Sequence, residues 1–357
     1  MPAIVIAAAL CSLCIWLQFF FRDSQHPPEA HTITLAKARV EVAERRGSTK
    51  PPYLKDAFPG GRHVRTVYGT IQVFEWGPSD GEKVLMLHGL GTPCIALSNM
   101  ARGFVEKGCR VMLFKLFGRG YSDAPNDLRH DARLYTSQIL LVLASSPLSW
   151  AGSSAFHIVG FSLGGSIAAG FAAYHAHMLR SMTLICPGGL IRKSHISCRD
   201  RILYSRGIPQ WARLKLLRRD LEPRAGTWSM EERDKTDEAG IDFDEVPIAM
   251  ERPWFIASYL STVQSSLVYG RHDQLWRDLG EELRRRQSSN PPPGLSGGRI
   301  CLILAEDDVI VVKDELIEDA QRVPPMATVD TFILKGGHEI AISRGKDMVT
   351  IAMQNWR

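Results

Sequence analysis

The chain has 357 residues, of which 45% are apolar and 23% are charged, and its formal net charge is +5. This is ordinary globular usage, so most of the chain can build a core, and one α/β unit of this size is common. The modest charge and the lack of any nucleic-acid-reading motif exclude RNA and DNA as expected partners.

The N-terminal segment, residues 3–21, is uncharged and almost entirely apolar. A helix of about 20 apolar residues spans a bilayer, so residues 1–22 are predicted to be a single-pass membrane anchor. A cleaved signal peptide, which would make the protein secreted or lumenal, is the alternative, but no Lys or Arg precedes the apolar run. Because the basic residues follow the segment, beginning with Arg22, the remainder is predicted to face the cytosol, with the endoplasmic reticulum as one candidate membrane.

A polar connector, residues 23–62, leads into a predicted single domain, residues 63–357. Alternating β-branched residues predict a hairpin within 65–76. Continuous apolar runs then predict buried strands, which alternate with helical patterns. The strands are expected at 83–89, 109–114, 155–160 and 181–186, and the helices at 95–107, 134–144 and 162–176. This alternation predicts a mostly parallel sheet flanked by helices.

The alternation stops at about 188–270, where repeated prolines and short amphipathic pieces predict a helical cap over the sheet's C-terminal edge. Within the cap, an apolar stripe either packs over the site or rests on a membrane surface. Its members are Trp211, Leu214, Leu217 and Leu221. The alternation resumes with a strand at 299–304, a helix at 313–321, a strand at 328–334 and a terminal helix at 339–353.

The turn at 160–164 reads Gly-Phe-Ser-Leu-Gly and matches the G-x-S-x-G nucleophile elbow. A predicted strand runs into it and a predicted helix runs out, which is the context that the motif requires. Gly160 and Gly164 relieve the crowding of so tight a turn. Ser162 is therefore predicted to be an exposed nucleophile at the helix N-terminus.

A serine of ordinary pKa needs a general base. His338 follows the last predicted strand, in a loop that returns to the strand ends where Ser162 lies. Asp308 follows the next-to-last strand and is predicted to orient the histidine, which gives the chain order Ser, Asp, His. Asp307 is the near alternative for this acid, and Glu306 is a third.

Two backbone N–H groups are predicted to form the oxyanion hole. The first belongs to Leu163, directly after the serine, and the second to Leu90, which follows another buried strand. Gly89 lets this second turn approach closely. His88 is expected to hold the turn by hydrogen bonds and not to titrate during the reaction.

From Val84 to the C-terminus the chain resembles the α/β-hydrolase superfamily, in the stretches LMLHGLG, LFGRGYSDAP, VGFSLGG, LAEDDVIV and KGGHE. The whole chain is similar, more narrowly, to fungal membrane-anchored serine hydrolases. The resemblance implies an eight-stranded, mostly parallel sheet with a cap domain. The acid loop departs from the family pattern, since Ala305 replaces a glycine and Val309 and Val312 replace prolines, which keeps Asp307 open. Relatives with an aspartate nucleophile, such as epoxide hydrolases and haloalkane dehalogenases, are excluded as guides because the position is Ser162.

These residues predict a serine hydrolase that cleaves an ester, lactone or thioester of a small or lipophilic substrate through an acyl-serine intermediate. No cofactor and no metal are expected. The alternatives are acyl transfer, carbon–carbon bond hydrolysis with the same triad, or a catalytically silent, membrane-anchored binding protein. Substrate identity and oligomeric state stay open, because fold alone does not determine function.

Overall fold

The computed structural model describes residues 57–205, 208–224, 253–265, 267–269, 273–322 and 328–356. Within them lies one eight-stranded sheet with the order β1-β2-β4-β3-β5-β6-β7-β8. Its strands are β1 (Gly61–Thr66), β2 (Gly69–Trp76), β3 (Lys83–Leu87), β4 (Arg110–Phe114), β5 (Phe156–Phe161), β6 (Leu179–Ile185), β7 (Arg299–Ala305) and β8 (Thr328–Leu334). β2 is antiparallel to both β1 and β4, and all other neighbours are parallel. The predicted α/β-hydrolase sheet is confirmed.

The N-terminal hairpin is longer than the sequence pattern indicated. β1 begins at Gly61, whereas the prediction began at Arg65 and assigned residues up to 62 to the connector. Along β1, exposed residues alternate with half-buried ones, so its first half carries few apolar side chains to mark a strand. The pairing of Gly61 with Phe74 shows that these residues belong to the sheet.

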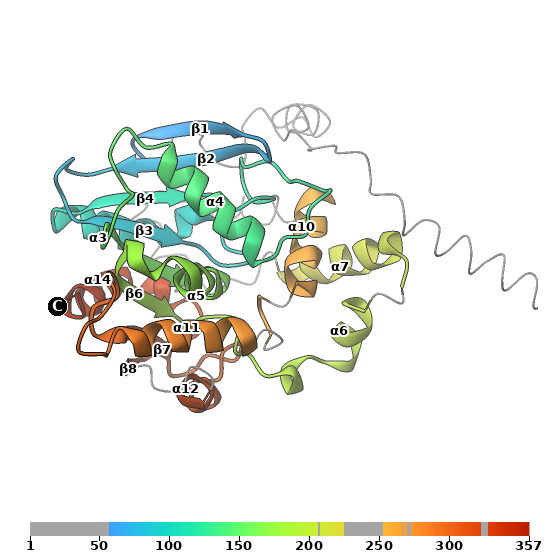
Figure 1. The fold of residues 1–357 in the computed structure, drawn as a ribbon. Coiled ribbons are helices and arrows are strands. Elements are labelled where there is room, and N and C mark those ends of the chain that lie inside the picture. The colour runs from blue at the N-terminus through green and yellow to red at the C-terminus, as the bar shows by residue number, and fades with distance from the viewer. Residues whose placement is uncertain are drawn as a thin grey trace, which may run out of the picture.

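Helices join the parallel strands and cover the sheet (Figure 1). α5 (Leu163–His175) packs between α4 (Ala132–Ala144) and α11 (Asp273–Arg285), while α3 (Ser98–Glu106) packs against α14 (Gly345–Gln354). β3 and β5 run through the middle of the sheet, and β5 is buried along its whole length. Such continuous burial is why the sequence shows unbroken apolar runs there.

Two helices differ from the sequence prediction. α11 was not predicted, although Leu275, Leu279 and Leu283 recur at helical spacing and are buried where α11 packs on α5. The predicted terminal helix is two helices, α13 (Ile340–Ser343) and α14. The break lies at Arg344, directly before Gly345, where an added Cβ would stand only 2.7 Å from the Met100 backbone nitrogen.

The described part of the cap is helical, as expected. It consists of η3 (Lys193–His195), α6 (Cys198–Leu203), α7 (Gln210–Arg224) and α10 (Pro253–Gln264). A small core joins α6, α7 and α10, with Leu203, Leu217 and Phe255 among its members. Residues 225–252 of the predicted cap lie outside the described residues.

The apolar stripe predicted on α7 is only partly buried. Leu217 is buried and Leu214 packs against the same cap core. Trp211, in contrast, is 72% exposed, so its assignment to the core-facing side is wrong. The cap core is small and covers only part of this helix. The side chain of Leu221 lies outside what the structure describes.

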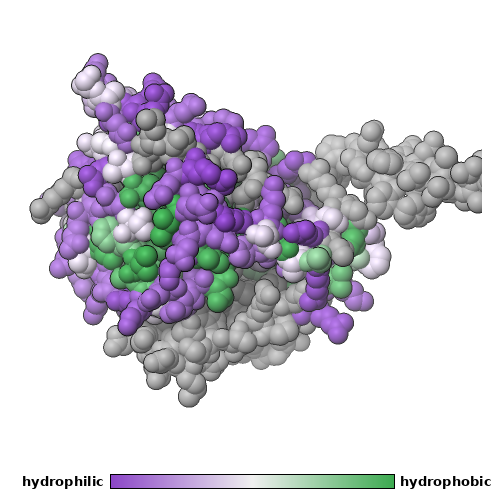
Figure 2. Space-filling view, turned by 90° about the horizontal axis from the view of Figure 1, so that it is seen from below, coloured by the Kyte–Doolittle hydropathy of each residue, from purple (hydrophilic) through white to green (hydrophobic). Residues whose placement is uncertain are grey.

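On the face seen in Figure 2, the coloured residues are mainly hydrophilic, with one larger group of hydrophobic side chains and a smaller one beside it. Across the described residues, no helix combines the length and the apolar character needed to cross a bilayer. The predicted membrane helix, residues 1–22, lies outside them.

Candidate active site

Ser162 stands at the turn between β5 and α5. Its backbone has φ 54° and ψ −117°, a conformation that L residues rarely adopt and that costs about 1–3 kcal/mol. The flanking glycines permit this turn. A Cβ added at Gly160 would lie 2.4 Å from the Gly164 carbonyl oxygen, and one added at Gly164 would lie 2.2 Å from the Leu87 carbonyl oxygen. Gly160 therefore lets α5 approach its own strand β5, and Gly164 lets α5 approach β3.

His338 lies beyond the end of β8, in the loop that returns to Ser162. Its Nε2 lies 2.9 Å from the Ser162 Oγ, and its Nδ1 lies 2.7 Å from the Asp308 Oδ2. With the proton on Nδ1, the imidazole donates to the carboxylate and accepts from the serine hydroxyl. The ring is only partly exposed and packs beside Phe161.

Asp308, not Asp307, faces the histidine. Its side chain is fully buried, and its Oδ1 accepts hydrogen bonds of 2.8 Å from the backbone N–H groups of Ile310 and Val311. Burial alone would raise the pKa of this carboxyl, but the hydrogen bonds from His338 and from these N–H groups outweigh it and lower the pKa. Asp308 is thus an anion that can orient the imidazole. Asp307 is exposed, and so is Glu306.

The two predicted oxyanion donors flank Ser162. Leu163 is the first residue of α5, where a backbone N–H has no partner within the helix. A Cβ added at Gly89 would lie 3.3 Å from the Ser162 Cβ, so the turn that carries Leu90 packs directly on the nucleophile. The N–H groups of Leu163 and Leu90 therefore stay the predicted donors to a carbonyl oxygen bound at Ser162.

His88 holds this turn as expected. Its Nδ1–H donates to the Gly89 carbonyl oxygen at 2.9 Å, and its Nε2 accepts from the Leu116 N–H at 3.1 Å. Burial lowers the pKa of His88 to about 3, so the ring is neutral at physiological pH. Both ring nitrogens are occupied by the backbone, which leaves none for proton transfer.

Two residues near the site were given no role in the sequence analysis. Cys186 follows β6, is buried and has a φ of 40°. Its Sγ, an Asp308 oxygen and a His338 nitrogen lie within 4.8 Å of one another, which is the geometry of a possible metal site. Burial, reinforced by the charge of Asp308, raises the pKa of the Cys186 thiol, so the thiol of the metal-free protein is protonated at neutral pH. The second residue is Arg119, which contacts the Leu90 carbonyl group.

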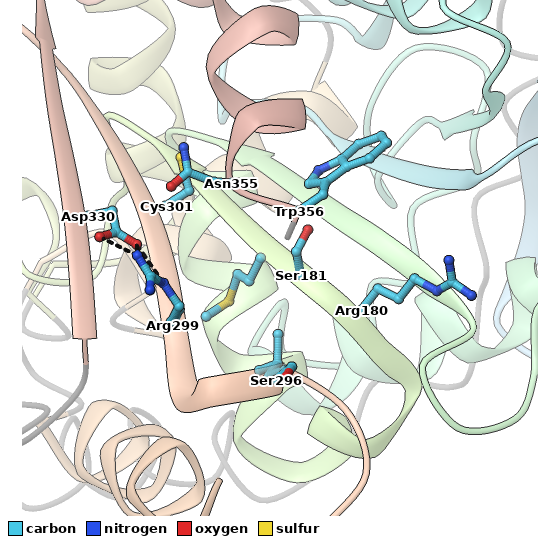
Figure 3. A pocket seen from close by; sticks show the side chains of 10 residues that line it. Arg180, Ser181, Ser296, Arg299, Cys301, Asp330, Asn355 and Trp356 are labelled. Atoms are coloured by element: carbon cyan, nitrogen blue, oxygen red, sulfur yellow. Dashed lines mark hydrogen bonds and ion pairs between the residues drawn. The ribbon is translucent and has the colours of Figure 1, made fainter. Parts of the chain in front are cut away.

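A separate pocket lies at the opposite edge of the sheet (Figure 3). It is lined by residues at the beginnings of β6, β7 and β8, including the Arg299–Asp330 ion pair, and by Trp356. Its volume is about 30 Å³, room for water but not for an acyl substrate. The candidate active site is therefore the one at the carboxyl ends of the strands.

Comparison with known proteins agrees with this geometry. A family model described as alpha/beta hydrolase fold matches residues 83–239. Two hydrolases of Comamonas testosteroni are each 35% identical over 117 residues, which is 31% of this chain and 38% of theirs. They are named as hydrolases of 2-hydroxy-6-oxo-6-phenylhexa-2,4-dienoate and of 2-hydroxy-6-oxononadienedioate and its nonatrienedioate analogue. The match spans well under half the length of these relatives.

Solved structures extend the comparison along the chain. An esterase from Rhodococcus sp. ECU1013 gives a TM-score of 0.58 at 17% identity, over 83% of this chain and 98% of that one. An enol-lactonase from Burkholderia xenovorans LB400 gives 0.57 at 14% identity, over 82% and 98%. At such low identity these likenesses concern the fold. Together with the family match and the sheet order, they show that the chain has the α/β-hydrolase fold. The narrower resemblance to fungal membrane-anchored hydrolases stays a prediction.

Proposed function

We propose that the chain is a serine hydrolase that cleaves an ester, lactone or thioester of a small or lipophilic substrate. The observation that carries this proposal is the continuous hydrogen-bond chain from the Ser162 Oγ through His338 to Asp308. A catalytically silent binding protein has no need of this arrangement, nor of a strained serine backbone.

The reaction follows from the geometry. His338 Nε2 takes the proton of Ser162 as the Oγ attacks the substrate's carbonyl carbon, and Asp308 stabilises the imidazolium that forms. The negative charge on the former carbonyl oxygen is met by the N–H groups of Leu163 and Leu90. His338 then gives its proton to the leaving group, and an acyl-serine remains. Water, activated by the same histidine, releases the acid and restores Ser162.

The second candidate reaction is hydrolysis of a carbon–carbon bond with the same three residues. It is favoured by the partial match to the two Comamonas hydrolases, whose named substrates are oxo-dienoates. Acyl transfer to an alcohol is the third, since it needs only an acceptor other than water. Incubating the protein with an ester and with a 2-hydroxy-6-oxo-dienoate, and identifying the products by mass spectrometry, separates these reactions.

Replacement of the nucleophile tests the proposal. Ser162→Ala is expected to abolish hydrolysis of p-nitrophenyl acetate, a loss on the order of a millionfold, and to abolish labelling by a fluorophosphonate. Ser145→Ala is the matched control, because Ser145 is a half-buried serine at the end of α4, away from the site. Substantial ester hydrolysis by folded Ser162→Ala would overturn the assignment.

The membrane location is a further part of the proposal. Residues 3–21 support it, because they are long and apolar enough to span a bilayer. In this arrangement the connector joins the anchor to a cytosolic hydrolase domain that starts at β1. The substrate of this domain is a small or lipophilic acyl compound. Extraction of the full chain from membranes by alkaline carbonate would contradict the anchor.

A further inference from the structure

Arg119 is a buried arginine between the cap and the turn that carries Leu90. It is 3% exposed and lies in the loop that follows β4. Its Nε donates to the Leu90 carbonyl oxygen at 2.9 Å, and its Nη1 donates to the hydroxyl of Ser258 on α10. The guanidinium carbon also stands 4.7 Å from the centre of the Phe255 ring, on the same helix. One side chain thus joins the cap to the candidate oxyanion hole.

The loop around Arg119 is held in shape by its own backbone hydrogen bonds and packs closely on α10. The backbone N–H of Arg119 donates to the Leu116 carbonyl oxygen, and the N–H of Gly118 donates to the Asp123 carbonyl oxygen, each at 2.9 Å. Gly118 has a φ of +76°, and a Cβ there would lie 2.2 Å from the Ser258 Oγ. Glycine at this position is what lets the loop and α10 meet.

The charge of Arg119 has no carboxylate partner in the described part of the chain. The aspartate of its own loop, Asp123, instead accepts from the Thr70 N–H at 2.7 Å. The Arg119 Nη2 is buried, and the described residues offer it no hydrogen-bond partner. Burial lowers the pKa of Arg119, but a guanidinium stays protonated in proteins. Burying an unpaired charge costs free energy, so the presence of Arg119 at this place indicates that its charge has a function.

The site provides such a use. Leu90 offers its N–H to the oxyanion, while its carbonyl group is held by Arg119. Fixing the carbonyl group restrains the residue's backbone torsions and so the direction of its N–H. The Arg119 cation is thus hydrogen-bonded to the same residue, Leu90, whose N–H is the predicted donor to the developing negative charge. Its field already reaches the preceding His88, whose pKa it helps to lower. A positive charge left unpaired in the resting enzyme is stabilised most when the oxyanion forms, which is the condition for lowering a barrier.

We propose that Arg119 is a positioning residue for the oxyanion hole. Its side chain holds the Leu90 carbonyl group by a hydrogen bond and places a positive charge next to the developing oxyanion. Through Ser258 it also connects the Leu90 turn to α10. The inference rests on the proposed serine-hydrolase function.

The proposal predicts a loss in turnover and not in substrate binding. Arg119→Met should lower kcat for p-nitrophenyl acetate about 100-fold and leave KM nearly unchanged, since misplacing an oxyanion donor by about 1 Å costs this much. The affinity for a trifluoromethyl ketone, which binds as a tetrahedral oxyanion, should fall by the same factor. Arg119→Lys should recover part of both losses, because it restores the charge but not the two-sided clamp.

A matched control separates positioning from simple stability. Arg286 is also a buried arginine that holds backbone carbonyl oxygens, here those of Gly294 and Pro293, before β7 and away from the site. Arg286→Met should destabilise the fold without changing the ratio of ketone affinity to substrate KM. Ser258→Ala, which removes one contact of Arg119, should lower kcat about tenfold.

The outcomes are distinguishable. If wild-type protein is not labelled by a fluorophosphonate, the proposed function fails, and this inference fails with it. If wild-type protein is labelled but folded Arg119→Met keeps wild-type kcat and ketone affinity, only the role of Arg119 is overturned. An increase in KM with unchanged kcat would also overturn it, because it would make Arg119 a substrate-binding residue.

Discussion

Asp308 and Asp307 are neighbours with different surroundings. The side chain of Asp308 is buried against His338 and accepts two backbone N–H groups, while that of Asp307 is exposed. Asp307 takes part in the turn through its backbone, whose N–H donates to the Gly336 carbonyl oxygen at 3.0 Å. This bond joins the acid loop to the loop of His338. The first residue therefore acts through its carboxylate and the second through its main chain.

This difference predicts opposite results for two matched substitutions. Asp308→Asn should lower kcat for p-nitrophenyl acetate roughly ten-thousandfold, because an amide holds His338 in the wrong tautomer. Asp307→Asn should leave kcat within a few-fold of the wild type, since it keeps the backbone bond and changes only an exposed group. Steady-state kinetics on both variants, with circular dichroism to confirm folding, checks the pair. The reverse ranking would make Asp307 the acid.

The structure brings Ser162 and His338 together, and both could be chosen from the sequence because each lies in a short local pattern. The choice of acid was harder, since which of two adjacent carboxylates turns inward depends on the loop, and the family's prolines are absent there. Arg119 and Cys186 were missed for another reason. Their partners are remote in sequence: Arg119 meets Leu90 and Ser258, and Cys186 meets Asp308 and His338. No local pattern can report such contacts.

At the scale of elements, the burial of a strand determined how accurately the sequence predicted its bounds. Strands buried on both faces, such as β3 and β5, produced continuous apolar runs and were predicted nearly to the residue. β1 is half exposed and was only partly found. α11 does show an amphipathic spacing, but it follows the irregular cap, where the strand–helix alternation no longer guides the assignment.

The contact between α5 and β3 can be tested with two glycines of one helix. Gly164→Ala should destabilise the protein by about 1–3 kcal/mol, because the new Cβ would meet the Leu87 carbonyl oxygen at 2.2 Å and the strand cannot retreat. It should also reduce ester hydrolysis, since the elbow must shift. Urea unfolding followed by circular dichroism measures the change in the free energy of unfolding.

Gly170→Ala is the control for helix propensity. Its Cβ would meet the Leu275 Cδ1 at 3.1 Å, the end of a flexible side chain, and alanine favours a helix over glycine by about 1 kcal/mol. Its stability should therefore stay close to that of the wild type or exceed it. If Gly164→Ala were as stable and as active as Gly170→Ala, the inference that α5 and β3 are in tight contact at Gly164 would be wrong.

Three buried histidines link the stability of the whole molecule to pH. Burial is the main cause that lowers the pKa of His88, His130 and His157 to about 3, from an ordinary value of 6.5. The unfolded chain therefore binds protons at these positions below pH 6.5, whereas the folded chain does not. Stability is full above that pH and is lost as the pH falls toward 3. The lowered pKa of Asp308 acts only below this window, because its ordinary value is 3.8.

The free energy of unfolding should accordingly fall by about 4 kcal/mol between pH 7.5 and pH 5.5, since each histidine contributes up to about 1.4 kcal/mol per pH unit. Urea unfolding at a series of pH values measures this fall.

His130→Phe should reduce this fall to about 3 kcal/mol, because the substitution removes one of the three proton sites. The ring nitrogens of His130 make no hydrogen bonds to the described residues, and its ring meets Tyr135 edge-on, so phenylalanine can keep the packing. His177→Asn, at an exposed position, is the control and should leave the fall unchanged. A pH dependence that His130→Phe does not alter would mean that this histidine takes up a proton without unfolding of the protein.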